Sequence, residues 1–359
     1  MPNPLDDAKV YTLADLKVWE TLRPGLPPSL AVLGHPVAHS VSPQMHNAAL
    51  GELSKAHPEL KEWRYFKFDI RPVQLGEAFA LLEKNNFKGT NLTVPHKNSA
   101  AVLAYGINVD WKPGASASIR KINILEEVFA ESGDLHSINT VTFLKRLRTY
   151  NTDGYGLVRA LKRDVQVGLE GKTAVILGAG GAASEAANEC LRQQCATLWI
   201  GSRDEQKRQQ LCAILEKTYN VVRAIPNKFN PETKVEINGF DISDTAIAKQ
   251  WPEDVIVINA TTLGMKRDDP VPFDVSLLGK YACVFDMVYN RQGPTRFVEA
   301  ARARDLRAAD GLGMLIWQGA KSLTIWIKAH EGIEITPESI AQTMMDAACT
   351  PLGLPPRHA

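Results

Sequence analysis

A glycine-rich turn between a predicted strand and a predicted helix is the feature that most limits the fold of this chain. Residues 172–177 form an apolar run typical of a buried strand, and residues 182–193 have helical spacing. Between them stands Gly178-Ala-Gly-Gly-Ala-Ala183. Gly178 permits the tight turn, Gly180 lets the backbone approach a pyrophosphate, and Ala183 allows close helix packing. This context predicts a Rossmann-type dinucleotide-binding domain; a purely structural turn is the alternative.

Strands and helices alternate on both sides of this turn, which predicts an α/β protein with parallel sheets. Before the turn we expect strands at 30–34, 64–70 and 89–93, helices at 43–53, 73–84 and 122–130, and a hairpin over 139–151. After it we expect strands at 196–200, 255–258 and 282–285, and helices at 205–219, 314–327 and 337–348. Residues 1–28 form a polar lead-in with no expected element, and residues 105–121 are expected to be irregular.

The length of 359 residues suits about two domains. We predict a substrate-binding catalytic domain over residues 1–152, of which 1–28 are an extension. A Rossmann NAD(P)-binding domain is predicted over residues 153–310. The helices within residues 311–359 are expected to return to the first domain and pack on it.

Charge and cysteine content exclude several classes of protein. The 41 basic and 40 acidic residues give a net charge of +1, which offers no electrostatic case for nucleic acid or an anionic membrane. The five cysteines form no C-x-x-C pair, and no secretory signal or membrane-length apolar run is visible. His35, His39 and His46 lack acidic or cysteine neighbours at metal-ligand spacing. These observations favour a cytoplasmic protein that acts on a small molecule without a metal.

Two polar runs each follow an apolar strand pattern and contain one titratable residue. Lys97 ends Gly-Thr-Asn-Leu-Thr-Val-Pro-His-Lys, and Asp153 lies within Asn-Thr-Asp-Gly-Tyr-Gly. Loops at strand ends are rigidly held, and α/β proteins build sites there. Burial disfavours the charge of a lysine, so Asp153 is the natural partner of Lys97. Such a pair can exchange a proton with a substrate hydroxyl while hydride moves to a nicotinamide, although a structural ion pair is the alternative.

Two further loops carry candidate binding residues. Ser40 and Ser42 follow the first strand and offer hydroxyls to a polyol or a carboxylate, unless Ser42 only caps the helix ahead of Pro43. At the end of the strand 196–200, Arg203 and Lys207 stand one helical turn apart and would bind the 2′-phosphate of NADP. Asp204 would instead accept hydrogen bonds from the free ribose hydroxyl of NAD. NADP is favoured and NAD stays possible.

Taken together, these motifs resemble the shikimate dehydrogenase family from about residue 30 to about residue 332. The loop 34–47 is similar to the family's substrate-carboxylate loop, and residues 89–97 resemble its catalytic segment. Residues 138–140 and 151–156 match as well, as do residues 259–265, 285–290 and 310–318, which resemble segments lining the cleft. The resemblance implies that Lys97 is the catalytic lysine and Asp153 its partner.

The resemblance also implies the binding residues. Substrate contacts are implied for Ser40, Ser42, Thr93, Asn139, Tyr289 and Gln318. Cofactor contacts are implied for Gly178, Ala179, Gly180, Gly181, Ala182, Ser202, Arg203, Lys207, Met287 and Gly311. The implied activity is the NADPH-dependent, reversible reduction of 3-dehydroshikimate to shikimate in an interdomain cleft. This is a step of the shikimate pathway toward chorismate and the aromatic amino acids, and the protein is expected to be a monomer or a homodimer.

The chain departs from the family's pattern in ways that keep alternatives open. The family's usual NADP clamp reads Asn-Arg-Thr, whereas this chain has Ser202-Arg203-Asp204, and relatives that accept NAD carry an acid nearby. The segment between Lys97 and Asn139 is longer than expected, and an elongated first domain also occurs in quinate/shikimate dehydrogenases. An NAD-preferring quinate/shikimate dehydrogenase is therefore the alternative, although Ser42 argues against it because quinate-preferring relatives often carry threonine there. A folate-linked methylene dehydrogenase and a non-catalytic regulator are the other classes considered.

Overall fold

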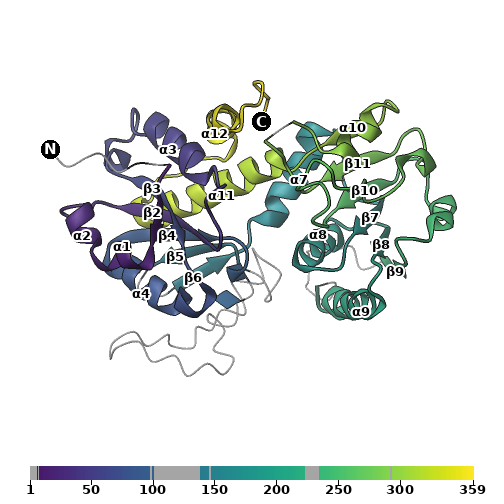
Figure 1. Ribbon diagram of the computed structural model, residues 1–359, viewed down its shortest axis with the longest axis horizontal. Helices are drawn as coiled ribbons and strands as arrows, with labels where there is room; N and C mark the ends of the chain where they lie inside the picture. The colour runs from purple at the N-terminus through teal and green to yellow at the C-terminus, as the bar shows by residue number, and fades with distance from the viewer. Residues whose placement is uncertain are drawn as a thin grey trace. The chain divides into compact units, whose positions relative to one another are not determined.

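The computed structural model describes residues 6, 8–97, 99–100, 138–144, 147–222, 234–291 and 293–359. The chain divides into two compact units (Figure 1). Unit 1 comprises Met1–Thr152, Gln318–Pro351 and Pro355–His358, and unit 2 comprises Asp153–Trp317, Leu352–Leu354 and Ala359. The helix expected at 122–130 and the irregular segment 105–121 lie outside the described residues.

Unit 1 is built on a mixed six-stranded sheet in the order β1-β3-β2-β4-β5-β6. Its strands are β1 (Val10–Thr12), β2 (Ser29–Gly34), β3 (Arg64–Asp69), β4 (Phe87–Leu92), β5 (Thr140–Phe143) and β6 (Leu147–Tyr150). The first four pair in parallel, whereas β5 is antiparallel to both β4 and β6. The antiparallel pairing of β5 with β6 confirms the predicted hairpin, whose residues 145–146 are not among those described.

Helices cover both faces of this sheet, with α3 and α11 on one face and α1 and α4 on the other (Figure 1). The helices are α1 (Leu13–Lys17), α2 (Trp19–Leu22), α3 (Ser42–Leu53), α4 (Leu75–Lys84), α11 (Leu312–Glu331) and α12 (Glu338–Leu352), with 3-10 turns η1 (Pro58–Leu60) and η2 (Pro72–Gln74). Side chains alternate along a strand, so Phe66 and Phe68 of β3 pack with α1 and α4. Tyr65 and Lys67 consequently lie on the opposite face.

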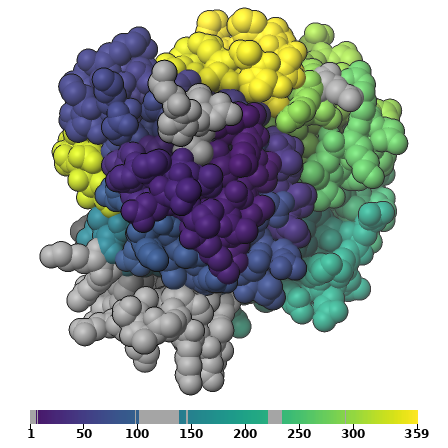
Figure 2. Space-filling view, turned by 60° about the vertical axis from the view of Figure 1, so that its left-hand side comes forward, coloured from purple at the N-terminus to yellow at the C-terminus, as the bar shows by residue number. Residues whose placement is uncertain are grey.

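The prediction that residues 1–28 form no element is wrong. β1 pairs in parallel with β3, and α1 and α2 follow it. Trp19 is fully buried, with its ring 5.0 Å from that of Phe66 and 5.4 Å from that of Phe87. The buried residues of this segment lie partly in a strand and partly in short helices. They therefore show neither the alternation of a strand nor the repeat of a helix in the sequence. Figure 2 shows the N-terminal residues, in dark purple, as a broad part of the surface.

Unit 2 is built on a second six-stranded sheet in the order β12-β11-β10-β7-β8-β9, in which all neighbours are parallel. Its strands are β7 (Thr173–Leu177), β8 (Thr197–Gly201), β9 (Glu236–Phe240), β10 (Ile256–Asn259), β11 (Cys283–Asp286) and β12 (Arg307–Ala309). Read from the β9 edge, this is the doubly wound order of dinucleotide-binding domains, which confirms the Rossmann prediction. The strands β9 and β12 were not predicted, because β9 is polar and β12 has three residues.

Two buried clusters join helices to the faces of this second sheet. The helices are α7 (Asp153–Asp164), α8 (Gly181–Arg192), α9 (Glu205–Val222) and α10 (Arg296–Arg302), with 3-10 turns η3 (Thr245–Gln250) and η4 (Val275–Leu277). One cluster contains residues of α7, α8 and α9, and the other contains residues of α10, η3 and η4. The strand order reverses between β7 and β10, so the loops after these strands form the crevice where such sheets bind ligands.

Candidate functional site

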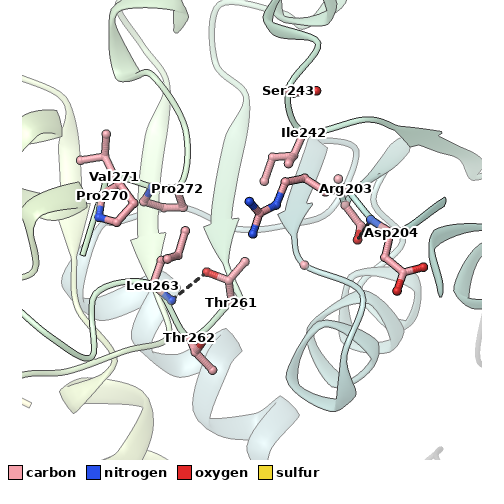
Figure 3. A pocket seen from close by; sticks show the side chains of 13 residues that line it. Arg203, Asp204, Ile242, Ser243, Thr261, Thr262, Leu263, Pro270, Val271 and Pro272 are labelled. Carbon is pink, nitrogen blue, oxygen red and sulfur yellow. Dashed lines mark hydrogen bonds between the residues drawn. The ribbon is translucent and has the colours of Figure 1, made fainter. Parts of the chain in front are cut away.

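A pocket of about 740 Å³ opens in unit 2 where the strand order reverses (Figure 3). Its lining comes from the loops after β7, β8, β9 and β10 and from residues 270–272, which precede η4. The lining residues are Gly178, Gly201, Ser202, Arg203, Asp204, Ile242, Ser243, Thr261, Thr262, Leu263, Pro270, Val271 and Pro272. This position matches the cofactor crevice predicted from the glycine-rich turn.

The glycine-rich turn forms an open cradle at the start of α8. Gly178 has a φ of 125°, a conformation that favours glycine, and a Cβ there would lie 3.1 Å from the carbonyl oxygen of Ala260. Gly180 and Gly181 are exposed, and a Cβ on either would meet no atom within 4 Å. The first amide groups of a helix have no intrahelical acceptor, so this end of α8 fits the pyrophosphate of a dinucleotide. Residues 178–182 therefore lie together, as the cofactor prediction requires.

Arg203 and Asp204 occupy different positions in this pocket. The guanidinium group of Arg203 extends into the space toward Thr261, while the carboxylate of Asp204 is directed away from it (Figure 3). Asp204 caps α9, because its carboxylate accepts a hydrogen bond from the amide of Lys207 at 3.0 Å and lies 3.1 Å from the Lys207 ammonium group. The amide hydrogen bond is the main cause that lowers the pKa of Asp204. Lys207 is thus paired with Asp204. Of the two basic residues predicted to bind the 2′-phosphate, it is Arg203 that lines the pocket.

A buried carboxylate connects the loops after β10 and β11. One oxygen of Asp286 accepts from the side-chain amide of Asn259 at 2.8 Å, and the other accepts from the Thr295 hydroxyl at 2.6 Å. Asn259 in turn accepts from the amide of Thr261, a pocket residue, at 3.0 Å. Burial outweighs these hydrogen bonds and raises the pKa of Asp286 to about 6. Asp286 thereby fixes one wall of the pocket.

The pKa of Asp286 predicts how unit 2 responds to pH. Below about pH 4 the carboxyl group is protonated in both folded and unfolded chains, so it does not oppose folding. Between about pH 4 and pH 6 the unfolded chain releases this proton while the folded protein keeps it, because ionisation would leave a buried charge. We expect this residue to remove about 2 kcal/mol from the free energy of unfolding between pH 4 and pH 7. Urea denaturation of the wild type and Asp286→Asn at both pH values should show that difference, and identical pH dependences would contradict it.

The remaining cofactor and substrate residues predicted in unit 2 lie after β11. The amide of Gly311 donates to the carbonyl oxygen of Val288 at 3.1 Å, and a Cβ on Gly311 would overlap the carbonyl of Met287. Met287 and Gly311 are therefore in contact, as the cofactor prediction expects of residues that share a site. Tyr289 is half-buried, and burial raises the pKa of its hydroxyl.

Unit 1 contains a buried hydrogen-bond network that joins distant segments. The side-chain amide of Asn91 donates to the Thr140 hydroxyl at 3.1 Å and to the Ser322 hydroxyl at 3.0 Å. The side chain of Asn139 contacts the Thr152 hydroxyl at 2.9 Å and the Gln318 oxygen at 3.4 Å. The structure thus brings Asn139 and Gln318 together, although 179 residues separate them in the chain.

The same network continues to the loop before α3. The Tyr65 hydroxyl donates to the side-chain oxygen of Asn91 at 2.8 Å and is also hydrogen-bonded to Ser42. Burial raises the pKa of Tyr65 well above its ordinary value, so it stays protonated. The Ser40 hydroxyl donates to that of Ser42 at 3.1 Å. Four predicted substrate residues, Ser40, Ser42, Asn139 and Gln318, therefore belong to one connected set.

Tyr65 and Ser322 are members of this network that lie outside the motifs found in the sequence. The sequence holds a signal for Ser322, which stands one helical turn after Gln318 on α11 and donates to its carbonyl oxygen at 2.9 Å. Tyr65 gives no such signal, because it stands in the aromatic strand Arg-Tyr-Phe-Lys-Phe-Asp.

Thr93, Lys97 and Asp153 stand next to residues of this network in the chain or in the backbone pairing. The amide of Thr93 donates to Leu33 at 3.0 Å, which continues the β2–β4 pairing, and Lys97 is half-buried rather than buried. The carbonyl oxygen of Lys97 accepts from the amide of Ile138 at 3.2 Å, next to Asn139. Asp153 is 8% exposed and is the first residue of α7 and of unit 2. It follows Thr152, whose amide donates to Asn139 at 2.9 Å.

The described part of the chain contains neither a metal-ligand cluster nor a membrane-spanning helix. Among these residues, no cluster of three or more His, Cys, Asp or Glu side chains is arranged to hold a metal ion. None of the helices within the described ranges has both the length and the apolar character needed to cross a membrane.

Comparison with known proteins identifies the family. Residues 32–109 match the family described as "Shikimate dehydrogenase substrate binding domain". Shikimate dehydrogenase (NADP(+)) of Symbiobacterium thermophilum is 34% identical over 85% of this chain and 91% of its own, and that of Moorella thermoacetica is 32% identical over 88% and 93%. Among solved structures, that of Thermus thermophilus shikimate 5-dehydrogenase in complex with NADP(H) and shikimate has a sequence 27% identical to this chain. The two structures match with a TM-score of 0.63 over 89% of this chain and 99% of the other. The chain therefore belongs to the shikimate dehydrogenase family.

Proposed function

We propose that this protein catalyses the NADPH-dependent, reversible reduction of 3-dehydroshikimate to shikimate. The buried network of unit 1 carries this proposal, because it joins hydroxyl and amide side chains that suit a polyhydroxylated carboxylic acid. The names of the curated relatives support the same reaction and the same cofactor. The open cradle at α8 and the Arg203 guanidinium group in the pocket are suited to a dinucleotide with a 2′-phosphate.

The bound substrate would be held by unit 1. Ser40 and Ser42 would donate hydrogen bonds to its carboxylate, while Thr93, Asn139 and Gln318 would fix the ring hydroxyls. Asparagine and glutamine amides can each donate and accept, so they can recognise a hydroxyl in either role. Tyr289 of unit 2 would contact the substrate as well.

Proton transfer would be the task of Lys97. When bound, NADPH supplies the hydride for the C3 carbon of 3-dehydroshikimate. Lys97 would stabilise the oxygen of the C3 carbonyl and donate one proton to it, which completes the hydroxyl of shikimate. In the reverse direction Lys97 would take that proton back. Asp153 would orient the lysine and accept a hydrogen bond from a neighbouring substrate hydroxyl.

Cofactor binding would divide among the residues of unit 2. Gly178, Ala179, Gly180, Gly181 and Ala182 would hold the pyrophosphate, and Ser202 and Arg203 would hold the 2′-phosphate. Lys207 would add its charge nearby, and Met287 and Gly311 would contact the nicotinamide half.

Steady-state kinetics that cross shikimate and quinate with NADP+ and NAD+ test this function. We expect the highest kcat/KM for shikimate with NADP+, and oxidation of NADPH when 3-dehydroshikimate is added. A preference for quinate with NAD+ would instead identify the alternative, an NAD-preferring quinate/shikimate dehydrogenase. A protein that binds shikimate but oxidises no NADPH would be a ligand-binding regulator.

The cofactor preference has its own prediction. Arg203→Ala should raise KM for NADP+ by about tenfold or more, because it removes charge-assisted hydrogen bonds to the 2′-phosphate, whereas KM for NAD+ should change little. Lys217→Ala, an exposed lysine farther along α9, is the matched control. Equal changes in KM for both cofactors would exclude a specific role for Arg203 at the phosphate.

A further inference from the structure

A lysine stands in the interior of the sheet of unit 1. Lys67 lies on β3 and is 4% exposed. Its strand is covered on both edges, since Lys67 is in register with Val10 of β1 and with Val32 of β2. Burying an ammonium group is costly unless hydrogen bonds compensate for the lost water. The position of Lys67 is therefore decided by the groups that its ammonium contacts.

Two of those groups belong to the loop between β2 and α3. The Lys67 ammonium donates to the carbonyl oxygen of Ala38 at 3.2 Å and to that of Ser40 at 3.4 Å. The same loop is fixed from within, because the amide of Ser40 donates to Val37 at 3.0 Å and its hydroxyl donates to Ser42 at 3.1 Å. Lys67 consequently holds the backbone of the segment that presents both serine hydroxyls.

The next side chain on the same face of β3 is an acid with a partner of its own. A carboxylate oxygen of Asp69 lies 2.5 Å from the imidazole Nδ1 of His35. His35 begins the same loop, so β3 holds this loop at two points, through Lys67 and through Asp69.

We propose that Lys67 is a positioning residue for the substrate carboxylate. It fixes the carbonyl groups of Ala38 and Ser40, which sets the hydroxyls of Ser40 and Ser42. The inference rests on the proposed function, because it takes these serines to be the carboxylate ligands. Aligned in this way, the two hydroxyls favour a carboxylate anion over a neutral ligand of the same shape, because hydrogen bonds to an ionised acceptor are the stronger ones.

The test compares Lys67→Met, Lys67→Arg and the exposed control Lys61→Met with two substrates, 3-dehydroshikimate and its methyl ester. For Lys67→Met we expect KM for the acid to rise about tenfold or more with kcat nearly unchanged, because carboxylate binding weakens while the reacting carbon is unaffected. KM for the ester and for NADPH should not change. Lys67→Arg keeps the charge and the donors, so it should restore most of the affinity.

The outcomes separate this inference from the proposed function. An unchanged KM for the acid, or equal increases for acid and ester, would overturn the inference while NADPH oxidation by the wild type upholds the function. Calorimetric titration with shikimate covers the case in which the wild-type protein shows no turnover. If Lys67→Met then binds shikimate more weakly than the wild type, the inference stands and the proposed function falls. A wild type that binds no shikimate would overturn both. If Lys67→Met does not fold, Lys67→Gln, whose shorter side chain does not reach both carbonyl groups, should show the same shift.

Discussion

Replacing Lys97 by alanine should lower kcat for the reduction of 3-dehydroshikimate by about 10²-fold or more. The physical reason is that the oxygen at C3 gains negative charge as hydride arrives, and alanine offers neither a proton nor a positive charge there. Lys97 is not among the residues predicted to bind the cofactor, so the affinity for NADPH should be unchanged. Pre-steady-state reduction and a fluorescence titration with NADPH measure the two quantities separately.

A matched lysine makes this result interpretable. Lys84→Ala, at the exposed end of α4, removes the same side chain from unit 1 and should leave kcat unchanged. Unaltered turnover in Lys97→Ala would remove Lys97 from the mechanism. A loss of NADPH affinity equal to the loss of kcat would point to a misfolded protein rather than a missing acid.

The second large effect concerns the N-terminal segment. Trp19→Ala should lower the free energy of unfolding of unit 1 by about 3–5 kcal/mol, the range for removing a buried tryptophan from a packed core. The indole is 0% exposed, and its ring centre lies 5.0–5.4 Å from those of Phe66, Phe68 and Phe87. Urea denaturation followed by circular dichroism measures the change, with the transition of unit 2 fitted separately because two-unit proteins need not unfold in one step.

The neighbouring residue provides the control. Val18 is 52% exposed, so Val18→Ala should change the free energy of unfolding by no more than about 0.5 kcal/mol. A change below about 1 kcal/mol in Trp19→Ala would mean that the N-terminal segment is not part of the core of unit 1.

The sequence predicted those parts of the fold whose determinants are local. The apolar run of β7, the turn at Gly178 and the helical spacing of α8 are consecutive, and each supports the next. β1 and β9 were missed because their determinants are not local. A strand of three residues, or one of polar residues, is stabilised by the neighbour it pairs with. Such pairing partners lie far away in the chain, and no period in the strand itself encodes them.

The candidate site divides in the same way. Lys97, Asp153 and the serines stand in recognisable motifs, so they were found individually. Their connection was not predictable, because the network depends on the registers of β3 and β4 against β2 and on α11, which brings Ser322 to Asn91 across 231 residues. Lys67 did carry a signal, since a lysine between two phenylalanines of a buried strand requires an explanation.

The position of β1 also bears on how the protein behaves in concentrated solution. Without β1, the six residues of β3 would form an open edge with unpaired amide and carbonyl groups and several aromatic side chains. Exposed edges of that kind pair with strands of other molecules and start aggregation. β1 covers Lys67, Phe68 and Asp69 of that edge, and it offers an edge of only three residues itself, of which Thr12 is exposed. The N-terminal strand therefore helps to keep neighbouring molecules from joining their sheets.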